Sequence, residues 1–415
     1  MSELPGPTGA RPEGLGRAVA PQPGAPRVLV VAGEASGDLR GAELVRALCE
    51  LVPDVEVFGI GGAELRRAGM RVLVDSSELS AMGLTELSSR WRTILASYRR
   101  VRDLLRAGET SAPGALAGGE PGPGRPDLAV LIDFPDFNLR LAKVARRAGV
   151  PVLYYVSPQV WAWRRYRVRT LARRVDHLAV VFPFEADLYR GLTEVTFVGH
   201  PALETVHATR SPHDTRVGIG LDPARPLITL LPGSRAAEIK ALLPAMLGAL
   251  EMVGPHVQAV IALADEALRP LVEELSGRKV PVVSGDTYNL VAAADLVLLS
   301  SGTATLETAL LERPMVIMYR LAPITYALAR LLVRVPFIGM PNLILNRRVV
   351  PELIQRQVTP ARIAREARAI LEDPLRAAEI RLELGRVRAL LGAPGAAGRA
   401  AEIAARMLES RGRST

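Results

Sequence analysis

Short, nearly uninterrupted apolar runs recur along the chain from Arg27 onward, and most are followed by a stretch whose apolar residues have helical spacing. Apolar runs of about four to eight residues are typical of strands buried on both faces, whereas a spacing of three or four is typical of helices packed on one side. The pattern predicts βα units that form a parallel sheet covered by helices. In the first half of the chain the predicted strands are Arg27–Ala32, Val55–Ile60, Asp127–Ile132, Val152–Val156, Leu178–Phe182 and Val195–Val198, with helices at Leu39–Leu51 and Asn138–Ala148.

The same pattern begins again after the weakly periodic segment His207–Pro226. Thr359 and Pro360 suit the N-cap and the first position of a later helix. We therefore expect an α/β chain of two Rossmann-like parallel-sheet domains, with a ligand site in the cleft between them and extra C-terminal helices. The second series has predicted strands at Pro226–Leu231, His256–Leu263, Val280–Val283, Leu296–Leu299 and Met315–Tyr319, then helices at Thr359–Glu372, Pro374–Leu391 and Ala396–Arg411.

The domain limits follow from local composition. Residues 1–26 are rich in Pro and Gly without periodicity, which predicts a disordered tail, and residues 108–126 have the same composition and read as a flexible insertion. The expected domains are residues 27–206 and 207–373. We expect the helices of residues 374–415 to pack back toward the first domain.

Length and composition exclude several classes of protein. At 415 residues the chain is long enough for two or three domains, and 49% hydrophobic with 23% charged residues excludes a wholly disordered chain. The longest stretch without a charged residue, Ala148–Trp163, has 16 residues, fewer than the ~20 of a membrane-spanning helix. No secretory signal is visible. Cys49 is the single cysteine, which excludes an internal disulfide and a cysteine zinc site.

Charge points to an anionic partner. With 52 basic and 43 acidic residues the net charge is +9, which favours nucleic acid, phosphorylated compounds or an anionic membrane. Only 4% of residues are aromatic and no recognition module is visible, so nucleic acid is disfavoured. Ser89–Arg106 has one apolar stripe flanked by arginines, so Trp91, Arg92, Arg99 and Arg100 are candidates for docking at an anionic membrane. The alternative is a surface helix whose stripe packs on the sheet.

In the first half, two turns that follow predicted strands carry candidate chemistry. Gly33–Asp38 lacks both the P-loop ending and the GxGxxG fingerprint. Its carboxylates, Glu34 and Asp38, suit a sugar hydroxyl better than a phosphate; the alternative is a tight turn in which Asp38 helps to cap the helix. Asp133 ends a strand, where a half-desolvated carboxylate could act as a general base. Asp136 is better placed as a helix cap, and Asp133 could be a plain cap as well.

In the second half, two helix starts suit phosphate groups. Gly233 and Ser234 offer backbone N–H groups, and Arg235 offers a guanidinium. Ser301-Gly302-Thr303 is a second, hydroxyl-rich helix start, and Glu307 lies one turn into that helix, where it could bind ribose hydroxyls. The pair favours a nucleotide-diphosphate pocket over ordinary helix capping. The five histidines lack metal-ligand spacing, and there is no GxSxG motif.

The ordered set of motifs resembles the lipid-A-disaccharide synthase family, glycosyltransferases of the GT-B fold. The segment Tyr155–Arg164 is the most specific, because no generic nucleotide-binding fold requires it. The resemblance covers about Arg27 to Arg411, and the N-terminal tail and the 108–126 insertion are additions that remove no motif residue. The other matching motifs are Val31–Asp38, Ala81–Glu86, Ile132–Asn138, Phe197–His200, Leu231–Arg235, Ser301–Glu307 and Met340–Leu343.

The resemblance implies a reaction of lipid A and lipopolysaccharide biosynthesis in the Gram-negative envelope. The family transfers 2,3-diacylglucosamine from UDP-2,3-diacylglucosamine to 2,3-diacylglucosamine 1-phosphate, which forms a β-1,6-linked disaccharide and releases UDP. The change from an α-linked donor to a β-linked product implies inversion, with a base that accepts the acceptor hydroxyl proton. Asp133 matches the family position proposed for that base.

The residues and the resemblance together give the expected site. No cofactor or metal is expected. Because both substrates carry acyl chains, we expect the basic helix to dock at the cytoplasmic face of the inner membrane. The expected protein is therefore cytoplasmic and peripherally bound to that membrane. It could also form a homodimer. The donor residues are Gly233, Ser234, Arg235, Ser301, Gly302, Thr303, Glu307 and Asn342, and the acceptor-side residues are Glu34, Ser36, Gly37, Asp38, Met82 and Asn138.

Two other classes of function stay open at this point. One is another UDP-sugar enzyme of the same fold, such as a GlcNAc transferase of cell-wall synthesis or a UDP-GlcNAc epimerase. The other is a non-catalytic protein that binds UDP-sugars at a membrane surface. Turnover of acylated against plain UDP-GlcNAc distinguishes the first, and UDP release distinguishes the second.

Overall fold

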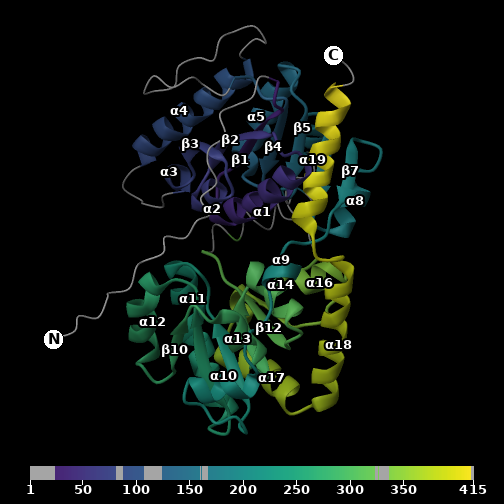
Figure 1. The fold of residues 1–415 in the computed structure, drawn as a ribbon. Coiled ribbons are helices and arrows are strands. Elements are labelled where there is room, and N and C mark those ends of the chain that lie inside the picture. The colour runs from purple at the N-terminus through teal and green to yellow at the C-terminus, as the bar shows by residue number, and fades with distance from the viewer. Residues whose placement is uncertain are drawn as a thin grey trace, which may run out of the picture. The chain divides into compact units, whose positions relative to one another are not determined.

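The computed structural model describes residues 24–80, 87–106, 124–158, 160, 167–322, 326 and 336–412, with the backbone alone at 79–80, 87–92 and 412. The chain forms two compact units (Figure 1). One comprises the described residues up to Tyr155 together with 397–412, and the other runs from Val156 to Ala396. The domain limits expected at residues 206 and 373 stay predictions.

The first sheet has seven strands in the order β3-β2-β1-β4-β5-β6-β7. Its described strand pairs are parallel, as the apolar runs predict. The predicted strands lie within two residues of the observed ones, but β3 was not predicted. Its apolar run is only three residues long, between Arg71 and Asp75, and its first two residues are only partly buried. The strands are β1 Arg27–Ala32, β2 Glu56–Gly61, β3 Arg71–Asp75, β4 Leu128–Ile132, β5 Val152–Tyr155, β6 His177–Val180 and β7 Glu194–Phe197.

The second sheet has six strands in the order β10-β9-β8-β11-β12-β13, and its pairs are also parallel. Only β13, three residues long, was not predicted. A two-sided apolar core explains why the strands read as continuous runs, since Leu298 and Ile228 are fully buried in adjacent strands. The strands are β8 Leu227–Leu231, β9 Gln258–Leu263, β10 Val282–Ser284, β11 Leu296–Ser300, β12 Met315–Tyr319 and β13 Glu352–Ile354.

Helices connect the strands, and several begin at the residues that the sequence predicts. Thr359 caps α17, since its hydroxyl oxygen accepts the N–H of Arg362. The prediction that Asp136 caps α5 was wrong: the N-cap is Phe134, Pro135 takes the first position, and Asp136 lies inside the first turn. The helices of the first unit are α1 Ala35–Leu51, α2 Ala63–Arg67, α3 Ser77–Ser80, α4 Leu87–Arg106, α5 Pro135–Arg147 and, from Ala397 on, α19 Ala396–Gly412.

In the second unit, α11 packs along α17, and the helix starts after β8 and β11 face the same sheet edge. Its helices are α7 Arg167–Ala172, α8 Pro183–Tyr189, α9 Ala202–Thr205, α10 Pro212–Gly218, α11 Ala236–Val253, α12 Arg269–Ser276, α13 Thr287–Ala292, α14 Thr303–Leu310, α16 Met340–Ile344, α17 Pro360–Leu371 and α18 Pro374–Leu390, with 3₁₀ turns at Glu266–Leu268 and Gln355–Gln357.

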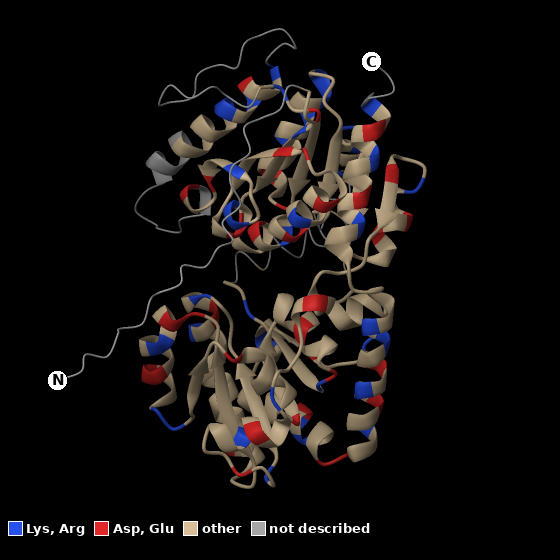
Figure 2. Cartoon of the chain, in the orientation of Figure 1, with Lys and Arg blue, Asp and Glu red and all other residues tan. Residues whose placement is uncertain are grey.

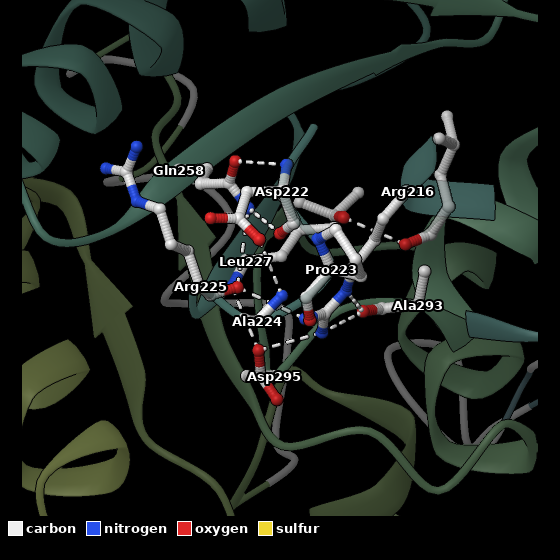
Figure 3. Close-up of polar contacts among 11 residues, drawn as sticks. Arg216, Asp222, Pro223, Ala224, Arg225, Leu227, Gln258, Ala293 and Asp295 are labelled. Atoms are coloured by element: carbon white, nitrogen blue, oxygen red, sulfur yellow. Dashed lines mark hydrogen bonds and ion pairs between the residues drawn. The ribbon is translucent and has the colours of Figure 1, made fainter. Parts of the chain in front are cut away.

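A buried arginine ties α10 to the beginning of this sheet (Figure 3). The guanidinium of Arg216 donates to the carbonyl of Ala293 at 2.6 Å and to the carboxylate of Asp295 at 2.9 Å. It also donates to the carbonyls of Pro223 and Arg225, at 3.0 and 3.1 Å. An arginine guanidinium has five N–H groups and can therefore bond several acceptors at once. Arg216 in this way holds together the segment that leads into β8 and the segment that leads into β11.

We expect Arg216→Met to lower the free energy of unfolding by about 2–4 kcal/mol, because it removes a guanidinium donor from the Asp295 carboxylate and from three carbonyls. Urea denaturation measures the change. The matched control is Arg190→Met, whose side chain is 78% exposed and which should cost about 0.5 kcal/mol or less. Equal midpoints for the two variants would contradict the role of Arg216.

Candidate active site

The loops after β1 and β4 lie against each other in the first unit. A Cβ added to Gly33 would lie 2.4 Å from the ring of Phe134, so only glycine allows this approach. Glu34 and Ser36 are exposed next to it, while Gly37 is buried. The candidate residue Met82 lies outside the described residues.

Asp38 is a helix cap, although not of its own helix. Its carboxylate accepts the backbone N–H groups of Gly62, Glu64 and Leu65, at 2.5, 3.0 and 3.3 Å, and it is 6% exposed. These groups open α2, where a negative charge is also favoured by the helix dipole. A contact from Asp38 to a sugar therefore stays a prediction, and the carboxylate already satisfies three donors.

Asp133 lies in a strained turn at the end of β4. Asp133 and Phe134 both have φ of 47°, a conformation that is uncommon for residues other than glycine. Two side chains hold the Asp133 carbonyl in this turn: Asn138 donates to it at 2.8 Å and the Tyr154 hydroxyl at 2.6 Å. Asn138 is fully buried and also donates to the carbonyl of Ile132. It supports the turn, and strained turns of this kind cluster at functional sites.

Burial raises the pKa of the Asp133 carboxyl above its ordinary value. The guanidinium of Arg40 and the backbone N–H of Phe134 oppose this by lowering the pKa. A carboxylate with a raised pKa is a better proton acceptor than an ordinary aspartate, so the arrangement suits a general base.

The second unit contains a pocket of about 580 Å³ at the carboxyl ends of β8, β9 and β11. This is within the range of small-molecule sites. It is lined by six of the eight predicted donor residues: Gly233, Ser234, Ser301, Gly302, Thr303 and Glu307. The other lining residues are His207, Thr209, Leu231, Glu238, Ala262, Ala264, Gly285, Asp286, Thr287, Tyr288, Asn289, Ser300 and Ala304.

The other two predicted donor residues are not among the residues that line the pocket. Arg235 adjoins the pocket, but its guanidinium is paired with the carboxylate of Glu238 at 3.1 Å. Asn342 is fully buried: its amide donates to Val350 and Glu352 and accepts from the backbone of Val349 and Val350. Since these bonds use both ends of the amide, Asn342 holds the chain between α16 and β13, and a contact with UDP stays a prediction.

Tyr288 is a pocket residue that sequence reasoning missed. Its hydroxyl donates to the Glu307 carboxylate, and burial together with this neighbour raises the pKa of Tyr288 to about 12. Tyr288 is the second residue of α13, which follows β10 and Gly285. This is a third strand-end loop, at the same edge of the sheet as the two predicted ones. That shared edge was the signal that could have found it.

The basic helix α4 packs one face on the rest of the first unit, and basic residues recur along it (Figure 2). Val101 and Leu105 are fully buried, and the ring of Tyr98 meets that of Phe137 edge-on at 5.9 Å. Arg100 donates to the carbonyl of Leu73 at 2.8 Å, whereas Arg99 is exposed. The side chains of Trp91 and Arg92 lie outside the described part.

None of the helices that the structure describes is both long and apolar enough to cross a membrane. In the same described ranges, no three His, Cys, Asp or Glu side chains are grouped so that they could hold a metal ion.

Two Rossmann-like parallel sheets, each with candidate residues where strands end, define a GT-B fold, which solved structures share. MurG of Acinetobacter baumannii superposes with a TM-score of 0.53 and 14% identity, over 92% of this chain and 99% of that chain. A UDP-GlcNAc 2-epimerase from Neisseria meningitidis bound to UDP-GlcNAc gives 0.57 and 12%, over 92% and 100%. At these identities the likeness shows the fold alone.

Sequence comparison is more specific. The family model for lipid-A-disaccharide synthetase matches residues 28–404. Lipid-A-disaccharide synthase of Syntrophus aciditrophicus is 42% identical over 390 residues, which cover 92% of this chain and 98% of that protein. The synthase of Geobacter metallireducens is 43% identical, over 92% and 97%. The chain belongs to the lipid-A-disaccharide synthetase family and is a glycosyltransferase.

If Glu307 binds the ribose hydroxyls of UDP, Tyr288→Phe should weaken UDP binding by roughly 3–10-fold, since it removes the hydrogen bond that positions the carboxylate. Binding of 2′-deoxy-UDP, which lacks one ribose hydroxyl, should change less. Calorimetry with both ligands measures this difference.

Tyr189→Phe is the matched control for this pair of measurements, because it removes a buried hydroxyl that lies 3.1 Å from Ser157 and outside the pocket lining. It should leave the ratio of the two affinities unchanged. Equal losses for UDP and 2′-deoxy-UDP in Tyr288→Phe would show that Glu307 does not bind the ribose through this arrangement.

Proposed function

We propose that the protein transfers 2,3-diacylglucosamine from UDP-2,3-diacylglucosamine to the 6-hydroxyl of 2,3-diacylglucosamine 1-phosphate, and so forms the β-1,6-linked lipid A disaccharide and UDP. Membership of the synthetase family, over residues 28–404, carries this proposal. The pocket in the second unit supports it, because it combines helix starts suited to phosphate with a carboxylate suited to ribose.

Inversion at the sugar carbon needs one displacement, in which the acceptor oxygen attacks from the side opposite the leaving UDP. We propose that the carboxylate of Asp133 is the general base that accepts the proton of the attacking hydroxyl group. Its position at the end of β4 and its desolvation support this, because both make the carboxylate a better acceptor. The guanidinium of Arg40 opposes this effect by lowering the pKa of Asp133. Negative charge on UDP grows at the same time, and N–H groups at the helix starts would stabilise it.

Asp133→Asn keeps the shape of the side chain but removes the proton acceptor. UDP release from the acylated donor and acceptor should fall by roughly a hundredfold or more, while UDP still binds as in the wild type. Burial raises the pKa of Asp133 in the folded chain, so its stabilising contribution is present at low pH and is lost as pH rises through the folded pKa. At pH 7 the variant should therefore unfold at the same temperature or a higher one.

Asp136→Asn is the matched control, since Asp136 lies three residues away in the first turn of α5 and is exposed. It should keep most of the activity. Near-normal turnover in Asp133→Asn with loss in Asp136→Asn would reverse the assignment. Equal UDP release from plain UDP-GlcNAc by the wild type would favour a different UDP-sugar enzyme.

We also propose that the protein docks on an anionic membrane through the exposed face of α4. Leu95 is 46% exposed and Arg99 is exposed, whereas Val101 and Leu105 are fully buried. An exposed apolar residue beside a basic one fits a helix that lies at a membrane surface, where acylated substrates reside.

Arg99→Gln should weaken co-sedimentation with phosphatidylglycerol vesicles by about fivefold at low salt, because each arginine near an anionic surface contributes ~1 kcal/mol. The difference should disappear at high salt. Arg406→Gln on α19 removes the same charge from a side chain that is 62% exposed and serves as control. Identical losses for the two variants would exclude α4 as the docking element.

A further inference from the structure

The pocket of the second unit is acidic for a diphosphate site. Among its described lining residues there are three carboxylates, Glu238, Asp286 and Glu307, and no Lys or Arg. Asp286 is paired with Arg210, and Glu307 accepts the hydroxyl of Tyr288. Of these three carboxylates, Glu238 is the one that bonds the backbone N–H of Ser234, at the helix start after β8.

The Glu238 carboxylate occupies that helix start itself. Oε2 accepts the backbone N–H of Ser234 at 3.1 Å, and Oε1 accepts Nη1 of Arg235 at 3.1 Å. A helix N-terminal N–H and a guanidinium are the donors that hold phosphate oxygens in proteins. The carboxylate thus already bonds, in the free protein, two of the donors predicted for phosphate, the Ser234 N–H and the Arg235 guanidinium.

Gly233 is fitted to this carboxylate. Its φ is +126°, and a Cβ there would lie 2.4 Å from Oε2 of Glu238. Any other residue would displace the Glu238 side chain or distort the loop. The loop is therefore built to accept an anion close to its backbone, and Glu238 supplies that anion when no ligand does.

We propose that Glu238 is an internal competitor for the donor diphosphate, which must displace it from Ser234 and Arg235 in order to bind. This inference rests on the proposed function, because it takes the anion of that function as the ligand. Glu238 is a positioning residue in this account. Its return to the two donors after reaction lowers the affinity for UDP and favours product release.

The test is the affinity for UDP, measured by calorimetry. Glu238→Gln keeps an oxygen for the Ser234 N–H but loses the charge that pairs with Arg235 and repels phosphate. A unit charge at about 4 Å in water corresponds to roughly a fivefold change in affinity, so UDP should bind about fivefold more tightly. UDP should also dissociate more slowly, by a similar factor. Glu251→Gln, an exposed residue in the last turn of the same helix, should change neither value.

UDP binding by Glu238→Gln that equals or falls below that of the wild type would overturn the competitor role. Glu238→Ala, which also lacks the charge, should tighten binding in the same direction, so a folding defect in one variant leaves the test intact. Failure of the Glu238 role and failure of the proposed function give different results. If the wild type binds UDP and Arg235→Ala weakens it, the donor pocket stands whatever Glu238 does. If the wild type does not bind UDP, the proposed function itself fails.

Discussion

Parallel pairing of the strands is the constraint on which the rest of the structure depends. Because the described pairs in both sheets are parallel, the carboxyl ends of the strands gather at one edge of each sheet. In the first sheet β1 lies between β2 and β4, and in the second β8 lies between β9 and β11. Connections leave in opposite directions at these two switch points, which opens space above the strand ends for a ligand. Asp133 follows β4 at the first, and the two phosphate-type helix starts follow β8 and β11 at the second.

At both switch points the chain adopts a local arrangement that costs free energy and that folding alone does not require. Two successive left-handed residues hold Asp133 at the end of β4, and burial disfavours its charged form. In the second unit a carboxylate occupies a phosphate-type helix start and is bonded to Arg235. The surrounding structure compensates, through Asn138 and Tyr154 in the first unit. An unfavourable local conformation that neighbouring side chains stabilise is expected at functional sites.

The sequence was sufficient where the signal is local and insufficient where the partner is distant. Apolar runs located eleven of the strands, because a strand buried on both faces is apolar throughout, but β3 and β13 contain only three and two consecutive apolar residues. The role of Asp38 as a cap of α2 depends on backbone groups 24 to 27 residues away. The bonds from the Asn342 amide to Val350 and Glu352, eight and ten residues away, were not predicted, and its contact with UDP stays a prediction. Tyr288 was missed because it follows β10 and Glu307 follows β11, and these strands come to one sheet only through β9 and β8.

The identity and linkage of the product test the account most directly. The protein is incubated with UDP-2,3-diacylglucosamine and 2,3-diacylglucosamine 1-phosphate, and the lipid product is analysed by mass spectrometry and by the proton coupling at the new anomeric centre. The account predicts a tetra-acylated disaccharide monophosphate with a β-1,6 linkage, formed in equal amount with UDP. Release of UDP without a new glycosidic bond, or an α-linked product, would contradict it.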